Sequence, residues 1–186
     1  MKAVQIIARG QPVFIETPKP ELTDGHAIIK VQRVSLCGSD IRWIDYKMDG
    51  AYPSPPGVTG HEMVGVIDAI GENEEGFKVG DKVLALAPDH RAMAEYYLAR
   101  IDFLLKLADD VPIEHQVQAQ QLGTVFYAAQ RLPDLTDKTV AVIGQGSAGL
   151  WFNYVANERG AKRIIALDLK AYRLQLSEMY GATDTI

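Results

Sequence analysis

Residues 138–149 read Lys-Thr-Val-Ala-Val-Ile-Gly-Gln-Gly-Ser-Ala-Gly, and this stretch decides the fold of the second half of the chain. Its apolar run predicts a buried strand that passes directly into a glycine-rich turn. Residues 150–159 then have a helical pattern, residues 163–168 predict a second strand, and residues 171–180 predict a second helix. Strands that alternate with helices are typical of a parallel α/β sheet.

The turn Gly144-Gln145-Gly146-Ser147-Ala148-Gly149 fits the pattern G-x-G-x-x-G. The pattern alone is weak, but here it follows a predicted strand, opens a helix, and precedes Asp168 at the end of the next strand by about 20 residues. Gly144 permits the tight turn, Gly146 lets the backbone approach a pyrophosphate, and Gly149 allows the helix to pack closely on the strand. The sequence therefore predicts a dinucleotide site formed by Gly144, Gly146, Ser147, Ala148 and Gly149.

Two charged residues bear on the choice of dinucleotide. Asp168 is expected to accept hydrogen bonds from the adenosine ribose, and its charge would repel a 2′-phosphate, so we expect NAD rather than NADP. Arg173 lies one turn into the following helix and is a candidate contact to the ribose or phosphate. A solvated helix arginine explains Arg173 equally well. The competing interpretation of the whole stretch is a glycine-rich turn with a capping aspartate.

The residues before Pro112 have a different sequence pattern. They contain many short runs rich in branched residues and separated by glycine and proline, at residues 13–16, 26–34, 63–70, 82–86 and 94–98. This pattern predicts a barrel or a sandwich of strands. Residues 113–132 contain almost no helix breaker and predict one helix. We therefore expect a β domain at residues 1–116, followed at residues 117–186 by a linking helix and the start of a nucleotide-binding domain.

The composition excludes several classes of partner. The chain has 186 residues, a net charge of −5 and one cysteine. It has no basic patch for nucleic acid, and no apolar run approaches the roughly 20 residues that a membrane span needs. A single cysteine without a recognisable signal peptide predicts a cytoplasmic protein.

The one cysteine, Cys37, opens the run Cys37-Gly38-Ser39-Asp40, and Gly60-His61-Glu62 follows later in the chain. A thiolate and a neutral imidazole form a pair suited to zinc, while Asp40 and Glu62 provide carboxylates as further ligands or as partners of ligands. One cysteine excludes a disulfide framework and a four-cysteine zinc site. The plain alternatives are a buried, unreactive cysteine and a structural histidine.

With these motifs the chain resembles the zinc-dependent medium-chain dehydrogenases, which include alcohol, sorbitol and threonine dehydrogenases. The run that begins at Cys37 resembles the family's zinc-cysteine motif, and residues 60–65 resemble its G-H-E-x-x-G signature. Residues 93–96 resemble its F-A-E-Y strand, and the glycine-rich turn lies where the family has it. The resemblance implies a GroES-like β-barrel catalytic domain, a Rossmann domain, and an active site between the two.

The resemblance also implies hydride transfer between an alcohol or polyol and NAD. Zn²⁺ bound by Cys37 and His61, with Glu62 able to swing in as an anionic ligand, would act as a Lewis acid on the substrate oxygen. Ser39 would carry the alcohol proton away, and Asp40 would orient the imidazole of His61.

The chain departs from the family at several positions. The lobe that binds a structural zinc is absent, so His90 is expected to be an ordinary loop histidine. Our alignment places Gln120, or Gln121 after a slip of one residue, where the family has an anionic third zinc ligand. Gln120 is therefore the expected third ligand, although a neutral one. Arg42 replaces a histidine of the family's proton relay, and arginine cannot shuttle protons near neutral pH.

Family members are longer, so the resemblance implies that further Rossmann strands lie beyond residue 186 and that the full-length form is a homodimer or homotetramer. Whether the 186 residues alone are active is left open. Two other functions also stay open: a zinc-free, quinone-reductase-like NAD(P)H oxidoreductase, and a non-catalytic nucleotide-binding fragment. Trp43 and Tyr46 are expected either to line the substrate pocket or to pack in the core.

Overall fold

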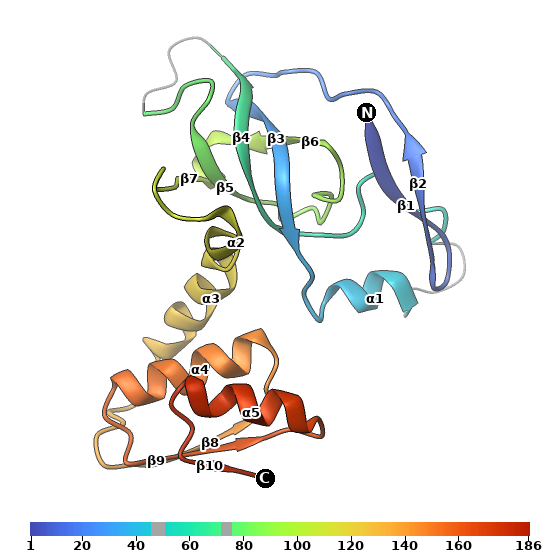
Figure 1. Cartoon of the computed structure of the whole chain (residues 1–186). Coiled ribbons are helices and arrows are strands. Elements are labelled where there is room, and N and C mark those ends of the chain that lie inside the picture. The colour runs from blue at the N-terminus through green and yellow to red at the C-terminus, as the bar shows by residue number, and fades with distance from the viewer. Residues whose placement is uncertain (46–50, 72–75) are drawn as a thin grey trace. The chain divides into compact units, whose positions relative to one another are not determined.

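The computed structural model describes residues 1–45, 51–71 and 76–186, so Tyr46 lies outside the described residues. The chain forms two compact units, Met1–Gln120 and Gln121–Ile186, which Figure 1 shows as the blue-to-yellow and the orange-to-red parts. The domain boundary that the sequence predicts after residue 116 stays a prediction.

The first unit consists mainly of strands. The strands are β1 (Lys2–Ala8), β2 (Gln11–Glu16), β3 (His26–Ser35), β4 (Glu62–Ile70), β5 (Lys82–Leu86), β6 (Tyr96–Arg100) and β7 (Leu104–Lys106). Its helical segments are α1 (Asp40–Asp45), the 3₁₀ turn η1 (Ile101–Phe103) and α2 (Ile113–Gln116). The strands that the sequence predicts are thus confirmed, with ends that move by one or two residues.

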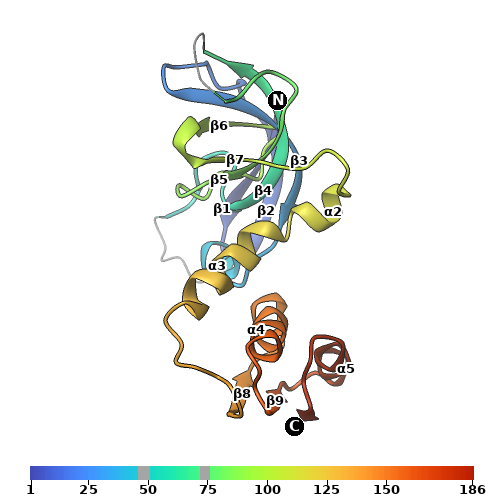
Figure 2. The ribbon, with the colours of Figure 1, turned by 90° about the vertical axis from the view of Figure 1, so that its left-hand side faces the viewer.

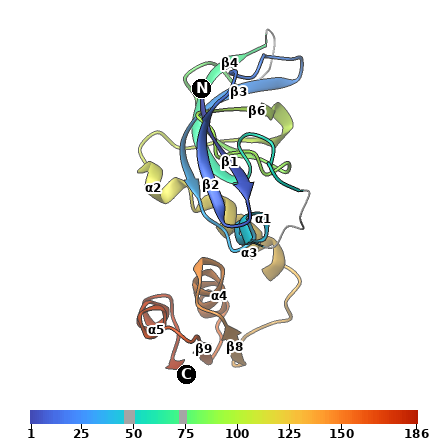
Figure 3. The ribbon, with the colours of Figure 1, turned by 90° about the vertical axis from the view of Figure 1, so that its right-hand side faces the viewer.

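These strands form a five-stranded antiparallel sheet in the order β6-β3-β4-β5-β7 and a separate β1–β2 hairpin. Figure 3 shows the hairpin alongside the larger sheet. The amide of Val4 in the hairpin donates to the carbonyl oxygen of Met93, in the segment that leads into β6, over 2.8 Å. The core of the unit is apolar and includes Ala27, Ile29, Met63, Ile67, Val83, Ala85 and Leu104.

β4 is the central strand, and its first four residues are all buried. Gly65 lies opposite Val31, where an irregularity in β3 between Val31 and Arg33 shifts the pairing. A Cβ atom on Gly65 would lie only 2.4 Å from the carbonyl oxygen of Lys30. The strands approach closely here because residue 65 has no side chain.

The second unit is the beginning of a parallel α/β fold. Its strands are β8 (Thr139–Ile143), β9 (Arg163–Leu167) and β10 (Asp184–Thr185), in the order β10-β9-β8 and parallel to one another. Figure 2 shows α4 (Ser147–Glu158) and α5 (Ala171–Met179) on the same face of this sheet. Ile143 on β8 is 86% exposed. The predicted fold class, a β domain followed by the start of a Rossmann domain, is confirmed.

The helix that the sequence predicts over residues 113–132 is instead two helices, α2 and α3 (Ala119–Ala129). The break falls where the apolar partners change. Val117 packs in the first unit against Val64 and Leu84, whereas Val125 packs in the second unit against residues of α4. Periodicity detects the apolar residues of both segments but not that they face two different cores.

We predict that Gly65→Ala destabilises the first unit, because the added methyl group overlaps the Lys30 carbonyl oxygen. Overpacking of this kind costs about 1–3 kcal/mol. Urea unfolding followed by circular dichroism measures the loss. Gly71→Ala is the matched control, since its Cβ would meet no atom within 4 Å. Equal stability of the two variants would contradict the close approach of β3 to residue 65.

Candidate functional site

Antiparallel pairing brings the predicted metal ligands together. Ser35 at the end of β3 pairs with Glu62 at the start of β4, and Glu62 pairs with Leu86 at the end of β5. Cys37 lies just beyond the end of β3, and His61 lies just before the start of β4. Both residues therefore lie at the same edge of the sheet, although many residues separate them in the sequence.

Cys37, His61 and Glu62 have the spacing of a metal site. One ligand atom from each residue lies within 4.8 Å of the other two. The Nε2 atom of His61 is 3.7 Å from Oε1 of Glu62, whose side chain is only 3% exposed. Cys37 is a free, partly buried thiol. A thiolate, an imidazole and a carboxylate are ligands that zinc accepts, so these residues fit a zinc ion.

Asp40 is 1% exposed and holds the backbone around this cluster. Its Oδ2 atom accepts a hydrogen bond from the amide of Cys37 over 2.8 Å, and its Oδ1 atom accepts one from the hydroxyl of Thr59 over 2.6 Å. The Nδ1 atom of His61 lies 3.7 Å from Oδ1, which is longer than a hydrogen bond. The expected role of Asp40 in orienting His61 stays a prediction.

The other predicted residues of this site have different surroundings. The Oγ atom of Ser39 is buried and has no hydrogen-bond partner among the described residues. Gln120 lies in the first turn of α3, and its role as a ligand stays a prediction. Gln121 is the partner of another residue, because its Oε1 atom accepts a hydrogen bond from the Ser147 hydroxyl over 3.5 Å.

His90 also belongs to this region, which the sequence did not indicate. Its ring centroid lies 4.6 Å from that of His61 and 5.8 Å from that of Trp43. Ligand atoms of Asp40, His61 and His90 lie within 4.8 Å of one another. His90 follows β5, whose end pairs with Glu62, so strand register rather than a local motif brings it here.

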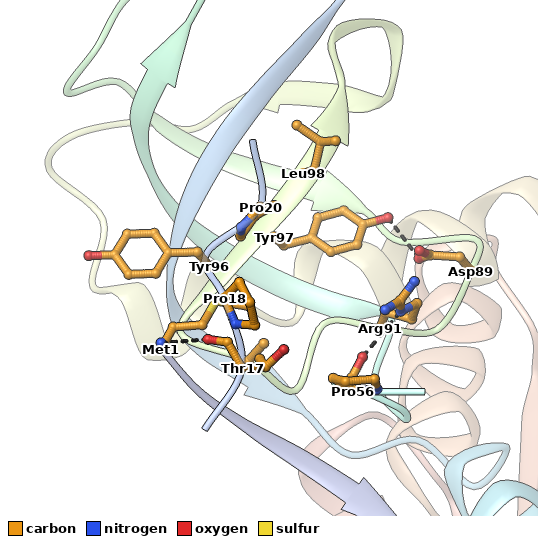
Figure 4. A pocket seen from close by; sticks show the side chains of 11 residues that line it. Met1, Thr17, Pro18, Pro20, Pro56, Asp89, Arg91, Tyr96, Tyr97 and Leu98 are labelled. Atoms are coloured by element: carbon orange, nitrogen blue, oxygen red, sulfur yellow. Dashed lines mark hydrogen bonds between the residues drawn. The ribbon is translucent and has the colours of Figure 1, made fainter. Parts of the chain in front are cut away.

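The loop that carries His90 is held on both sides of that residue. On one side, the hydroxyl of Tyr97 donates a hydrogen bond to Oδ1 of Asp89 over 2.8 Å. Tyr97, Asp89 and Arg91 line a hollow of about 310 Å³. Figure 4 shows the side chains around this hollow. Burial, followed by the Asp89 contact, raises the pKa of Tyr97, so its hydroxyl keeps the proton that it donates. The Nε atom of Arg91 donates to the carbonyl oxygen of Pro56 over 3.1 Å. A Cβ atom on Gly57 would lie 2.5 Å from the Arg91 carbonyl oxygen, so the two loops are in close contact.

In the second unit, the glycine-rich turn has the geometry that its sequence predicts. Gly144 has a φ of +90°, which a residue with a side chain rarely adopts. A Cβ atom on Gly149 would lie 1.9 Å from the carbonyl oxygen of Gly144, whereas one on Gly146 would meet nothing within 4 Å. Gly149 thus serves the packing of α4 on the turn, and the backbone at Gly146 stays open to a ligand.

Two buried amide side chains, which the sequence analysis missed, hold this turn in place. Gln145 is 1% exposed, and its Nε2 atom donates to the carbonyl oxygen of Val142 over 2.9 Å. Its Oε1 atom accepts a hydrogen bond from Nδ2 of Asn153 on α4 over 2.7 Å. Residue 145, which the G-x-G-x-x-G pattern leaves variable, is therefore an interior residue in this chain. Asparagine at the centre of an otherwise apolar helix face is the sequence signal that could have revealed the pair.

Asp168 ties the turn to the end of β9. It accepts hydrogen bonds from the amides of Gln145 over 2.7 Å and Lys170 over 2.8 Å. These two amides, with a smaller contribution from Arg173 at 3.5 Å, hold the pKa of Asp168 below its ordinary value. Ile143, Leu169 and Ile186 line an apolar hollow of about 650 Å³ next to these residues, which is enough for a nucleoside.

Comparison with known proteins agrees with both units. Residues 23–109 match the family model of the alcohol dehydrogenase GroES-like domain. The chain is 30% identical to the sorbitol dehydrogenase of Bacillus subtilis (strain 168), an alignment that covers all of this chain and 61% of that protein. Residues 23–109 thus match a domain of alcohol dehydrogenases, and the chain over its whole length is similar to a polyol dehydrogenase. It is also 29% identical to a probable D-xylulose reductase A of Aspergillus fumigatus, with 94% of this chain and 57% of that protein covered.

Solved structures of dehydrogenases are similar to the chain over its whole length. The galactitol-1-phosphate dehydrogenase of Escherichia coli matches all of it with a TM-score of 0.82 and 27% identity, over 60% of its own length. The alcohol dehydrogenase TADH of Thermus sp. ATN1 matches all of it with a TM-score of 0.84 and 26% identity, over 63% of its own length. The chain thus spans about 60% of the length of the relatives that it matches.

We predict that the charge of Asp168 stabilises the second unit only above acidic pH. Because its pKa is lowered in the folded chain, its contribution is present above the ordinary aspartate pKa of about 4 and is lost as the pH falls through the lowered value. Wild type should therefore be more stable than Asp168→Asn at pH 7, and the difference should shrink toward pH 2. Urea unfolding at a series of pH values measures it. A difference that stays constant with pH would contradict the prediction.

Proposed function

We propose that this chain carries out zinc-dependent hydride transfer between an alcohol or polyol and NAD. The observation that carries the proposal is the convergence of Cys37, His61 and Glu62 at one edge of the sheet, within 4.8 Å of one another. A GroES-like unit with such a cluster, followed by a unit with a dinucleotide turn, supports an oxidoreductase over either motif alone. Relatives named sorbitol dehydrogenase and xylulose reductase support an alcohol or polyol as the substrate.

Cys37, His61 and Glu62 would bind the zinc. When bound, zinc supplies a Lewis acid that stabilises negative charge on a substrate oxygen. Glu62 is almost fully buried beside His61, so its carboxylate balances positive charge at the site. Asp40 keeps the backbone of Cys37 in place through the amide contact, which fixes the direction of the thiolate.

Ser39 is the residue that we propose for moving the proton. Its hydroxyl oxygen is buried and has no partner among the described residues, so it can accept a hydrogen bond from a substrate hydroxyl. Arg42 cannot pass that proton on, because a guanidinium stays charged near neutral pH. The proton would therefore reach water through a group other than residue 42.

The second unit would bind NAD, which supplies the nicotinamide ring that takes up the hydride. The pyrophosphate would lie against Gly146, Ser147 and Ala148 at the start of α4, where backbone amides and the helix dipole favour an anion. Asp168 would accept hydrogen bonds from the ribose hydroxyls and repel a 2′-phosphate. Arg173 lies beside Asp168. The apolar hollow next to Asp168 would take the adenine.

The proposal also covers the cellular location and the oligomeric state of the protein. None of the helices in the described part of the chain is long and apolar enough to cross a membrane. The single cysteine and the net charge of −5 favour a cytoplasmic protein without a nucleic-acid partner. A homodimer or homotetramer is the proposed assembly of the full-length form.

Activity assays with purified wild type and Cys37→Ala test this function. We expect NADH to form from NAD and a panel of secondary alcohols and polyols, and Cys37→Ala to lower kcat/KM by about 1000-fold or more as the zinc ligand is lost. Zinc content is measured on the same samples. Activity toward quinones without bound zinc would support the quinone-reductase alternative. Neither zinc nor activity, with nucleotide binding retained, would support the non-catalytic alternative.

Gln120 is the neutral ligand that the sequence predicts in addition to Cys37, His61 and Glu62. If Gln120 is near the zinc, Gln120→Glu adds an anionic ligand, so we expect zinc to bind at least about tenfold more tightly. Gln121→Glu is the matched control, because Gln121 already accepts a hydrogen bond from Ser147. Competition with a chromophoric chelator measures both affinities. Unchanged affinity in Gln120→Glu, or a larger gain in Gln121→Glu, would overturn the assignment of Gln120.

A further inference from the structure

Asp40 is a buried carboxylate whose charge is poorly balanced. It is 1% exposed, and its two hydrogen-bond donors, the Cys37 amide and the Thr59 hydroxyl, are both neutral. Among the described residues, its ion-pair contact is with His61, at 3.7 Å. A buried charge is costly unless it is paired or bound to a cation. The surroundings of Asp40 therefore favour a cation.

Two histidines that lie near Asp40 each have a ring nitrogen without a partner among the described residues. The Nδ1 atoms of His61 and His90 are both buried, and neither has a hydrogen-bond partner in the described part of the chain. Buried polar atoms are nearly always satisfied, so the two unpartnered nitrogens of these neighbouring histidines favour a bound ligand. Two histidines and one carboxylate are a ligand set for divalent metals such as zinc or iron.

The distances allow one ion to join the three side chains. One ligand atom from each of Asp40, His61 and His90 lies within 4.8 Å of the other two. Bonds of about 2.0 Å in a tetrahedral zinc site place ligand atoms about 3.3 Å apart, so contraction by about 1.5 Å at most is needed. The His90 loop is held by Asp89 and Arg91 on either side, which limits how far His90 can move away.

We propose a second metal position, formed by Asp40, His61 and His90, which uses the Nδ1 atom of His61 rather than the Nε2 atom beside Glu62. The His61 Nδ1 atom faces Asp40, while Nε2 faces Glu62. A neutral imidazole has a lone pair on only one nitrogen, so the two positions are alternatives for a single divalent ion. The thiolate makes the Cys37 position the tighter one for zinc, and the second position fills when that thiolate is lost.

Removing the thiolate tests this proposal by metal content rather than by activity. We expect Cys37→Ala to retain about one zinc per chain, bound more weakly than in wild type, and Cys37→Ala/His90→Ala to bind it at least about 100-fold more weakly still. Cys37→Ala/His115→Ala is the matched control, because His115 is an exposed histidine on α2. Cobalt spectra should show the thiolate charge-transfer band in wild type and lose it in Cys37→Ala, with the ligand-field bands retained.

Histidine-labelled ¹⁵N NMR of Cys37→Ala gives a second readout that needs no further substitution. Zinc should shift the Nδ1 resonance of His61 and a ring-nitrogen resonance of His90, while the ring-nitrogen resonances of His26 and His115 stay in place. Zinc that binds wild type but not Cys37→Ala would overturn the second position and leave the proposed function standing. Zinc that binds neither protein would overturn both. Equal zinc affinity with and without His90 in the Cys37→Ala background would also overturn the proposal.

Discussion

The antiparallel register of β3, β4 and β5 is the constraint on which the candidate metal site depends. Glu62 pairs with Ser35 on one side and with Leu86 on the other, so three connections begin or end at one edge of the sheet. Cys37 follows the first strand, His61 precedes the second, and His90 follows the third. A slip of one residue in either pairing would turn every side chain of the slipped strand to the other face of the sheet and separate these groups. The buried core of the first unit fixes the register, and the register brings the candidate metal-binding side chains together.

Much of this arrangement could be predicted from the sequence, for physical reasons that differ between the two units. The dinucleotide turn is a local structure, because Gly144 and Gly149 act on atoms only a few residues away, and a short pattern is enough to recognise it. The grouping of Cys37 with His61 and Glu62 could be anticipated because the resemblance to a family supplied the long-range pairing. The residues alone offered only a thiol and an imidazole of compatible chemistry.

The features that the sequence did not predict depend on contacts between different elements of the fold. His90 has no motif around it, and it reaches His61 only through the pairing of β5 with β4 and through loop contacts to Tyr97 and Pro56. The buried pair of Gln145 and Asn153 was missed because the fingerprint treats residue 145 as variable. The break between α2 and α3 was missed because apolar periodicity does not distinguish two cores. In each case the deciding partner is distant along the chain or on another element.

Asp168 has a consequence for attempts to change the cofactor of such a protein. The same carboxylate that is proposed to select the ribose also accepts the amide of Gln145, which belongs to the glycine-rich turn. An engineer who replaces Asp168 to admit a phosphorylated ribose therefore also releases one end of the turn that should hold the pyrophosphate. Redesign of nucleotide preference at this position requires a compensating acceptor for the Gln145 amide, since selectivity and loop geometry are encoded in one side chain.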